Sequence, residues 1–145
     1  MYQETKQIAY KKGYKYQTQE IAIFQMNSLV GITIDTKYLQ VVPEGYLIIR
    51  EGYAWDGASG AIDTDSIMRG ALFHDACYQL MRAGLLADYQ KTFIDNKFHQ
   101  YCIEDGMFTI RAMYVLQAVE AFGHDSTLPE TIKEVLHAPL RLQNE

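Results

Sequence analysis

The chain has 145 residues, a net charge of −5 at pH 7 and a pI near 5.3. The length is typical of one domain, and 48% apolar against 21% charged residues predicts a folded globular protein. The acidic balance, with no broad cluster of Lys and Arg, argues against binding to nucleic acid. No apolar run is long enough for a transmembrane segment, and the two cysteines are too far apart for a CxxC zinc or redox motif, so we expect reduced thiols.

Residues 1–62 are predicted to form an antiparallel sheet, because β-branched and aromatic residues alternate there with polar ones. The strands are expected around three pairs of apolar residues: Ile21 and Ile23, Ile32 and Ile34, Leu47 and Ile49. The residue types at three further places favour turns, which are expected at Asn27–Ser28, Asp35–Thr36 and Pro43-Glu44-Gly45.

Residues 63–145 show a helical period instead. The first helix begins at Thr64 or Asp65, either of which can cap it, and ends at Gly84. A second helix is expected over roughly residues 88–104, a third over roughly 109–122 and a short fourth after Pro129. The third is apolar almost all round and is therefore predicted to be the central, most buried helix. The predicted fold is α+β, a single domain over residues 1–145 in which an antiparallel sheet precedes a three-helix bundle.

The apolar stretch LFHDACYQL, residues 72–80, contains two adjacent ionisable residues, His74 and Asp75. In a helix, His74 and Tyr78 lie on one face, and Asp75 points about 100° away from it. An imidazole is the natural acid or base near neutral pH when a neighbouring group orients it. We expect the second helix to pack antiparallel on the first and to supply Asp95 as the orienting carboxylate.

The segment GYAWDGASGAIDTD, residues 52–65, lies just before this helix. Its glycines allow the backbone to turn and to approach a ligand closely, and its aspartates add carboxylate oxygens. Such a loop next to Asp75 is suited to a hard cation such as Ca²⁺, and the only tryptophan is suited to wall a pocket. The candidate ligand-binding residues are Trp55, Asp56, Gly57 and Ser59. A structural explanation stays open for each feature. The His–Asp pair can be purely structural, and the glycine-rich segment can be only a tight connection between sheet and helix.

Three motifs occur in order along the chain: YAWDGASG, then RGALFHDACYQLMRAG with a later helical D-x-x-F that begins at Asp95, then RAMYVLQAVEAFG. In this combination the chain resembles an uncharacterised family common in phages and prophages, over about residues 30–123. One departure is Ile94, where the family usually has alanine. The resemblance implies a phage-type origin, with a location in the cytoplasm of the infected host or on the virion, and it assigns no activity.

A second resemblance is local. The sequence HDACY followed by a helical aspartate is similar to the HDxCY helix of secreted and parvoviral phospholipases A-two. The resemblance implies His74 as the base that activates water, Asp95 as its orienting carboxylate, Tyr78 as support and Asp75 as a Ca²⁺ ligand, with Gly57–Gly60 as the metal loop. The chain lacks the YGxG-type loop and the disulfide framework of those enzymes, and a β-rich half is not part of their fold.

Two functions follow from these features. The first is a small phage-encoded hydrolase of the phospholipase type, with His74 and Asp95 as a catalytic dyad. The second is a non-catalytic phage protein, either a virion component or a binding protein that sequesters a host molecule, as an anti-defence sponge does. Its partner would be a phage protein, a host protein or a small molecule, and it could form oligomers. The pairing also has a consequence for the cysteines. If His74 contacts Asp95 across antiparallel helices, Cys77 and Cys102 lie in opposite directions from that contact, roughly 15 Å apart, which is too far for a disulfide bond.

Overall fold

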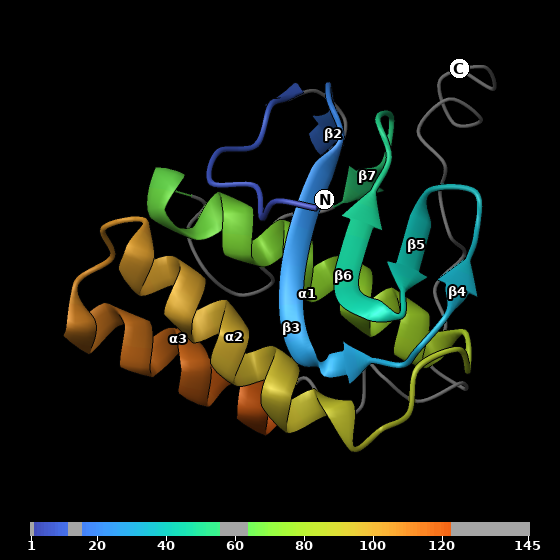
Figure 1. The fold of residues 1–145 in the computed structure, drawn as a ribbon. Coiled ribbons are helices and arrows are strands. Elements are labelled where there is room, and N and C mark those ends of the chain that lie inside the picture. The colour runs from blue at the N-terminus through green and yellow to red at the C-terminus, as the bar shows by residue number, and fades with distance from the viewer. Residues whose placement is uncertain (1, 12–15, 56–63, 123–145) are drawn as a thin grey trace, which may run out of the picture. The chain divides into compact units, whose positions relative to one another are not determined.

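The computed structural model describes residues 2–11, 16–55 and 64–122, and it confirms the predicted α+β class. The chain divides into two compact units. The described residues of the first unit lie between 2 and 55 and form the strands, and those of the second lie between 64 and 122 and form three helices (Figure 1). The single domain expected over residues 1–145 stays a prediction. Within the described ranges, no helix combines the length and the apolarity needed to cross a membrane.

The described part of the first unit contains two antiparallel sheets where the sequence predicted one. The smaller has the strand order β1-β2-β7, with β1 at Tyr10–Lys11, β2 at Tyr16–Thr18 and β7 at Ala54–Trp55. The larger has the order β3-β6-β5-β4, with β3 at Ala22–Val30, β4 at Ile34–Asp35, β5 at Leu39–Val42 and β6 at Glu44–Ile49.

The larger sheet confirms two predicted turns and corrects a third. The chain passes from β4 to β5 after Asp35 and from β5 to β6 at Pro43, close to the turns expected at Asp35–Thr36 and Pro43-Glu44-Gly45, although Glu44 and Gly45 already belong to β6. The predicted turn at Asn27–Ser28 is wrong, because both residues lie within β3. The pairing of β3 with β6 shifts register there, so a bulge accommodates these turn-type residues and the chain reverses only after Gly31, whose φ is +84°.

The buried side of β3 follows strand alternation. Ala22, Phe24 and Met26 are buried, whereas Ile21, just before the strand, is 52% exposed and Ile23 is half-buried. The two isoleucines that indicated a strand in the sequence therefore do not form its buried face.

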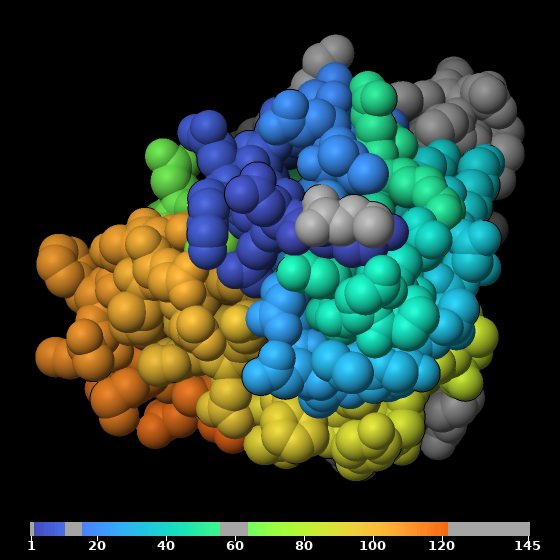
Figure 2. Space-filling view, in the orientation of Figure 1, coloured from blue at the N-terminus to red at the C-terminus, as the bar shows by residue number. Residues whose placement is uncertain are grey.

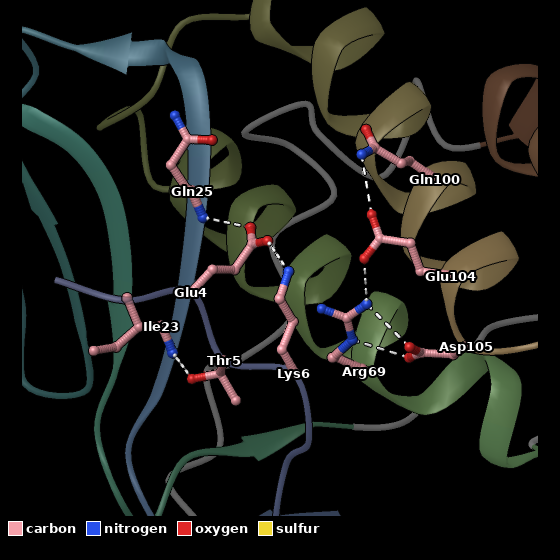
Figure 3. A network of polar contacts seen from close by, with 9 residues as sticks. All are labelled: Glu4, Thr5, Lys6, Ile23, Gln25, Arg69, Gln100, Glu104 and Asp105. Carbon is pink, nitrogen blue, oxygen red and sulfur yellow. Dashed lines mark hydrogen bonds and ion pairs between the residues drawn. The ribbon is translucent and has the colours of Figure 1, made fainter.

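The residues before β1 run along β3, which is an edge strand of the larger sheet (Figure 3). The Thr5 amide donates to the Ile23 carbonyl at 2.6 Å, and the Ile23 amide donates to Thr5 Oγ1 at 2.7 Å. The Gln25 amide donates to Glu4 Oε2 at 2.9 Å. These bonds satisfy backbone groups of the strand edge, which would otherwise be open to another chain.

The helices of the second unit lie close to where the sequence predicts them: α1 at Asp65–Arg82, α2 at Gln90–Glu104 and α3 at Thr109–Phe122. Thr64 is the N-cap residue of α1 and is extended. Gly84, which follows the C-cap Ala83, has a φ of +75°, the conformation that glycine adopts most readily after a helix. The fourth helix expected after Pro129 lies outside the described residues.

The most buried helix is α1, so the prediction that α3 is central and most buried is wrong. Nearly all of α1 from Ile67 to Met81 is buried. Among the described side chains of α3, Ala112 and Val115 are buried, whereas Ile110 and Tyr114 are 71% and 68% exposed. A helix that is apolar on every side does not indicate which side faces the core, and α3 packs mainly against α2.

Helices α1 and α2 pack antiparallel, as predicted. Arg69, near the start of α1, contacts Asp105, just after the end of α2, whereas His74 lies one turn further along α1 and contacts Asp95 within α2. Gly70 allows the two helices to approach closely. A Cβ atom on Gly70 would lie 2.9 Å from the Phe98 Cδ1 atom and 3.2 Å from the Phe98 carbonyl oxygen, so a larger residue would force the helices apart.

Arg69 forms a buried ionic cluster with the end of α2 (Figure 3). Its Nε donates to Asp105 Oδ2 at 2.9 Å, and its Nη2 donates to Asp105 Oδ1 and Glu104 Oε1, both at 3.0 Å. Arg69 is 3% exposed, and its guanidinium carbon lies 4.5 Å from the centroid of the Tyr101 ring. Burial acts to lower the pKa of Arg69, but the bonds to Asp105 and Glu104 raise it above its ordinary value.

Candidate active site

His74 and Asp95 form a buried hydrogen-bonded pair between α1 and α2. The His74 Nε2 and Asp95 Oδ1 atoms are 2.8 Å apart. Asp95 is 0% exposed and His74 is 8% exposed. The expected pairing of these side chains is therefore confirmed, while their catalytic role stays a prediction.

Two further side chains bind the Asp95 carboxylate. The Tyr78 hydroxyl donates to Oδ1 at 2.6 Å, which fits the supporting position expected for this tyrosine. Lys91, one turn before Asp95 on α2, donates from Nζ to Oδ2 at 2.8 Å. Both carboxylate oxygens are thus hydrogen-bonded and the charge is paired, which offsets the cost of burying it.

The protonation states follow from these contacts. Burial acts to raise the pKa of Asp95, but the hydrogen bonds from His74, Lys91 and Tyr78 outweigh it and hold the pKa below its ordinary value. Burial lowers the pKa of His74, although Asp95 acts in the opposite direction. Burial and the Asp95 carboxylate raise the pKa of Tyr78. Near neutral pH the site therefore holds an Asp95–Lys91 ion pair, a neutral imidazole and a neutral phenol.

The tautomer of His74 is fixed by its partner. An ionised carboxylate only accepts hydrogen bonds, so the proton of the neutral imidazole is on Nε2 and Nδ1 is left as an acceptor. Among the described residues, no hydrogen bond reaches Nδ1. The arrangement leaves one basic nitrogen uncommitted while the other is held by Asp95.

Aromatic packing fixes the plane of the imidazole. The centroids of the His74 and Tyr78 rings are 4.0 Å apart, and those of the His74 and Phe98 rings are 5.0 Å apart. Phe98 is the same residue that approaches Gly70. The close helix contact at Gly70 therefore also sets the position of the ring that packs on His74.

Lys91 is the member of the site that the sequence reasoning missed. Its signal was present, because a lysine four residues before an aspartate on one helix lies on the same face. Lys91 Nζ also lies 3.3 Å from the Glu120 carbonyl oxygen and 3.5 Å from the Val119 carbonyl oxygen, both in the last turn of α3. Carbonyl groups at a helix end lack partners within the helix, and a cation there is favourable.

The predicted Ca²⁺ site is only partly covered by the described chain. Asp75 is half-buried on α1, one residue after His74. Asp56, Gly57, Ser59 and the rest of the glycine turn up to Gly60 lie outside the described residues. Within the described ranges, no group of three or more His, Cys, Asp or Glu side chains is placed to hold a metal ion. The Asp75 carboxylate is an oxygen donor of the type that Ca²⁺ prefers, and its role as a ligand stays a prediction.

Trp55, the expected wall of a pocket, is buried in the first unit. It is 3% exposed, and its ring lies 5.4 Å from the Tyr16 ring and 5.7 Å from the Tyr10 ring. Its Nε1 atom is buried and has no hydrogen-bond partner among the described residues. The described contacts of Trp55 are those of an aromatic cluster, and its ligand-binding role stays a prediction.

Both cysteines are free and buried, as expected from the pairing of His74 with Asp95. Burial raises the pKa of Cys77 well above its ordinary value and raises that of Cys102 to about 12. Neither thiol is therefore a nucleophile near neutral pH, because the thiolate is the reactive form.

Comparison with known proteins gives no relative from which a function could be inferred, so the function has to be inferred from the geometry of the site. No family model, no curated protein and no solved structure matches this chain.

Proposed function

We propose that this chain is a small phage-encoded hydrolase of the phospholipase type, in which His74 is the general base. The observation that carries the proposal is the 2.8 Å contact between His74 Nε2 and the ionised Asp95. This contact orients a neutral imidazole and leaves Nδ1 as the acceptor, the state that a general base requires. The motif resemblance supports a phage origin and a location in the host cytoplasm or on the virion.

The proposed step is attack of water on an ester carbonyl. Nδ1 of His74 takes a proton from the water as its oxygen bonds to the carbonyl carbon, and the imidazolium later gives that proton to the departing alcohol oxygen. Asp95 stabilises the imidazolium through Nε2, and Lys91 and Tyr78 hold the carboxylate in place. Because the pKa of His74 is lowered, the base stays unprotonated at neutral and mildly acidic pH.

Ca²⁺ is the proposed cofactor, with Asp75 as one ligand and the turn at Gly57–Gly60 as the source of others. When bound, Ca²⁺ supplies positive charge that stabilises the developing oxyanion of the ester. The half-buried carboxylate of Asp75, adjacent to His74 on α1, is the described feature that supports this part of the proposal.

The test is fatty-acid release from vesicles of a zwitterionic and of an anionic phospholipid, measured by mass spectrometry with Ca²⁺ or with a chelator. The wild-type chain should release fatty acid. We expect His74→Ala to lose about 10²-fold or more, since removal of a general base typically has this effect. Asp75→Asn should lose the Ca²⁺ dependence. His99→Ala is the matched control, because His99 lies on α2 outside the His74–Asp95 network and should leave the rate unchanged.

Absence of release from either lipid, with or without Ca²⁺, would contradict the proposal. So would a His74→Ala variant that keeps the wild-type rate. Circular dichroism melting of each variant separates loss of chemistry from loss of fold.

A second candidate, a non-catalytic phage binding protein, is favoured by one observation. Asp95 is fully buried and its carboxylate accepts bonds from three donors. Such a network is also what a purely structural link between α1 and α2 would require. In that case His74→Ala would destabilise the fold by about 1–3 kcal/mol and would change no reaction rate.

A further inference from the structure

Helix α3 has two apolar sides. Its inner side includes Ala112 and Val115, which are buried. On the opposite side, Ile110, Met113, Tyr114, Gln117 and Ala121 recur at intervals of three and four residues, and all five are exposed. We call these five residues the outer stripe.

The outer stripe exposes a large apolar surface for a helix of this length. Ile110, Met113 and Tyr114 are 71%, 51% and 68% exposed, and Phe108, just before the helix, is 84% exposed. With about 200 Å² for each such side chain when free, roughly 500 Å² of apolar surface is left in water. Figure 2 shows atoms of the part of the chain that contains α3, coloured orange to red, at the surface in this view. A patch of this size is at the upper end of what monomers expose and often marks a contact site.

We propose that the outer stripe pairs with the outer stripe of a second copy of this chain, α3 against α3 across a twofold axis. With Phe108 included at the edge of the contact, two copies would together bury roughly 1,000 Å², which is the lower limit for a specific interface. The area therefore predicts a weak dimer that dissociates at micromolar concentrations.

The composition of the stripe favours a second copy as the occupant. In a twofold interface the same patch meets itself, so a charged residue within the patch would meet a like charge. The outer stripe contains no charged residue, although the chain carries a net charge of −5. Its spacing of three and four residues is that of paired helices, in which side chains of one helix fill the spaces on the other.

Sedimentation equilibrium of the full chain between about 1 and 200 µM should show a monomer–dimer equilibrium. Ile110→Ser combined with Tyr114→Ser should weaken dimerisation at least tenfold and leave the melting temperature of the monomer unchanged, because both side chains are exposed. Ile21→Ser is the matched control. Ile21 is also an exposed isoleucine, at 52%, but it lies in the first unit, so its dissociation constant should equal that of the wild type.

Gln117→Cys gives an independent readout. With oxidised glutathione as oxidant, this variant should form a disulfide-linked dimer, while Ile21→Cys should not; the native thiols Cys77 and Cys102 are buried. A wild-type chain that stays monomeric over the whole range overturns the proposal, whether the stripe is covered by another protein or by the chain's own residues 123–145. A dimer that Ile110→Ser with Tyr114→Ser leaves intact overturns it as well.

Discussion

Two buried polar clusters join α1 to α2, and they differ in what their charged groups leave open. In the Arg69 cluster, a cation that stays charged at every physiological pH meets two carboxylates, and Asp105 and Glu104 keep side-chain exposures of 20% and 36%. In the His74 cluster, the carboxylate of Asp95 is wholly buried and one partner is an imidazole whose pKa is lowered by burial.

The difference separates a structural ion pair from a candidate site. In the Arg69 cluster both carboxylates bond to the one guanidinium, and water reaches the carboxylates. The His74 cluster matches its charges, through Lys91, and it holds a neutral base with a nitrogen that no described residue uses. Burial is common to both clusters, so the titratable base is the feature that indicates chemistry.

The largest expected effect tests the two carboxylates against each other. Asp95→Asn should cost about 3–5 kcal/mol, because the Asp95 side chain is fully buried and the change leaves Lys91 without its ion-pair partner. Asp105→Asn should cost about 1 kcal/mol, because Arg69 keeps Glu104 and the site is partly solvated. Urea unfolding of the two variants measures both values. Equal losses would remove the distinction between the clusters.

A smaller effect is expected at the glycine between the clusters. Gly70→Ala should cost about 1–3 kcal/mol, because the new Cβ meets the ring and the carbonyl of Phe98 and overpacks the α1–α2 contact. Thermal unfolding measures the loss, and Phe98→Leu in the same chain should recover part of it, because leucine lacks the Cε1 atom that would lie 3.2 Å from the new Cβ. A Gly70→Ala variant more stable than the wild type, as helix propensity alone predicts, would show that the contact is not tight.

The smallest effect is the pH dependence of stability, which only the His74 cluster should produce near neutral pH. The pKa of His74 is lowered in the fold, so below about pH 6.5 the unfolded chain binds a proton that the folded chain does not. The contribution of His74 to the free energy of unfolding should therefore be fully present above about pH 6.5. Below that pH it should fall by roughly 1.4 kcal/mol per pH unit, until the pKa of His74 in the folded protein is reached. Urea unfolding at several pH values measures this slope. His74→Gln should flatten it, whereas an unchanged slope would mean that other groups cause it.

The sequence predicted the pairing of His74 with Asp95 because helical period and antiparallel packing are local rules. His74 and Tyr78 share a face by their spacing, and a polar residue in the middle of the facing helix is the natural partner. The ends of α1 were predicted well for the same reason: Thr64 occupies the N-cap position, although its side chain makes no cap hydrogen bond, and Gly84 follows the C-cap with a positive φ.

The errors arose where tertiary context decides. The apolar residues of α3 surround the helix, so only its packing on α2 reveals that the side with Ala112 is buried and the side with Ile110 is not. Asn27 and Ser28 favour a turn, but pairing with β6 holds them within β3. Lys91 reads as a surface lysine until the carboxylate four residues later is known to be buried.

The position of Lys91 links two distant properties of the second unit. Its Nζ atom binds the Asp95 carboxylate at 2.8 Å and lies 3.3 Å from a carbonyl of the last turn of α3. A molecule that displaces that turn would weaken the hold of Lys91 and so raise the proton affinity of Asp95. By reciprocity, protonation of Asp95 at low pH would weaken the contact of Lys91 with the end of α3. Binding of a molecule at the last turn of α3 and protonation of Asp95 are therefore thermodynamically coupled.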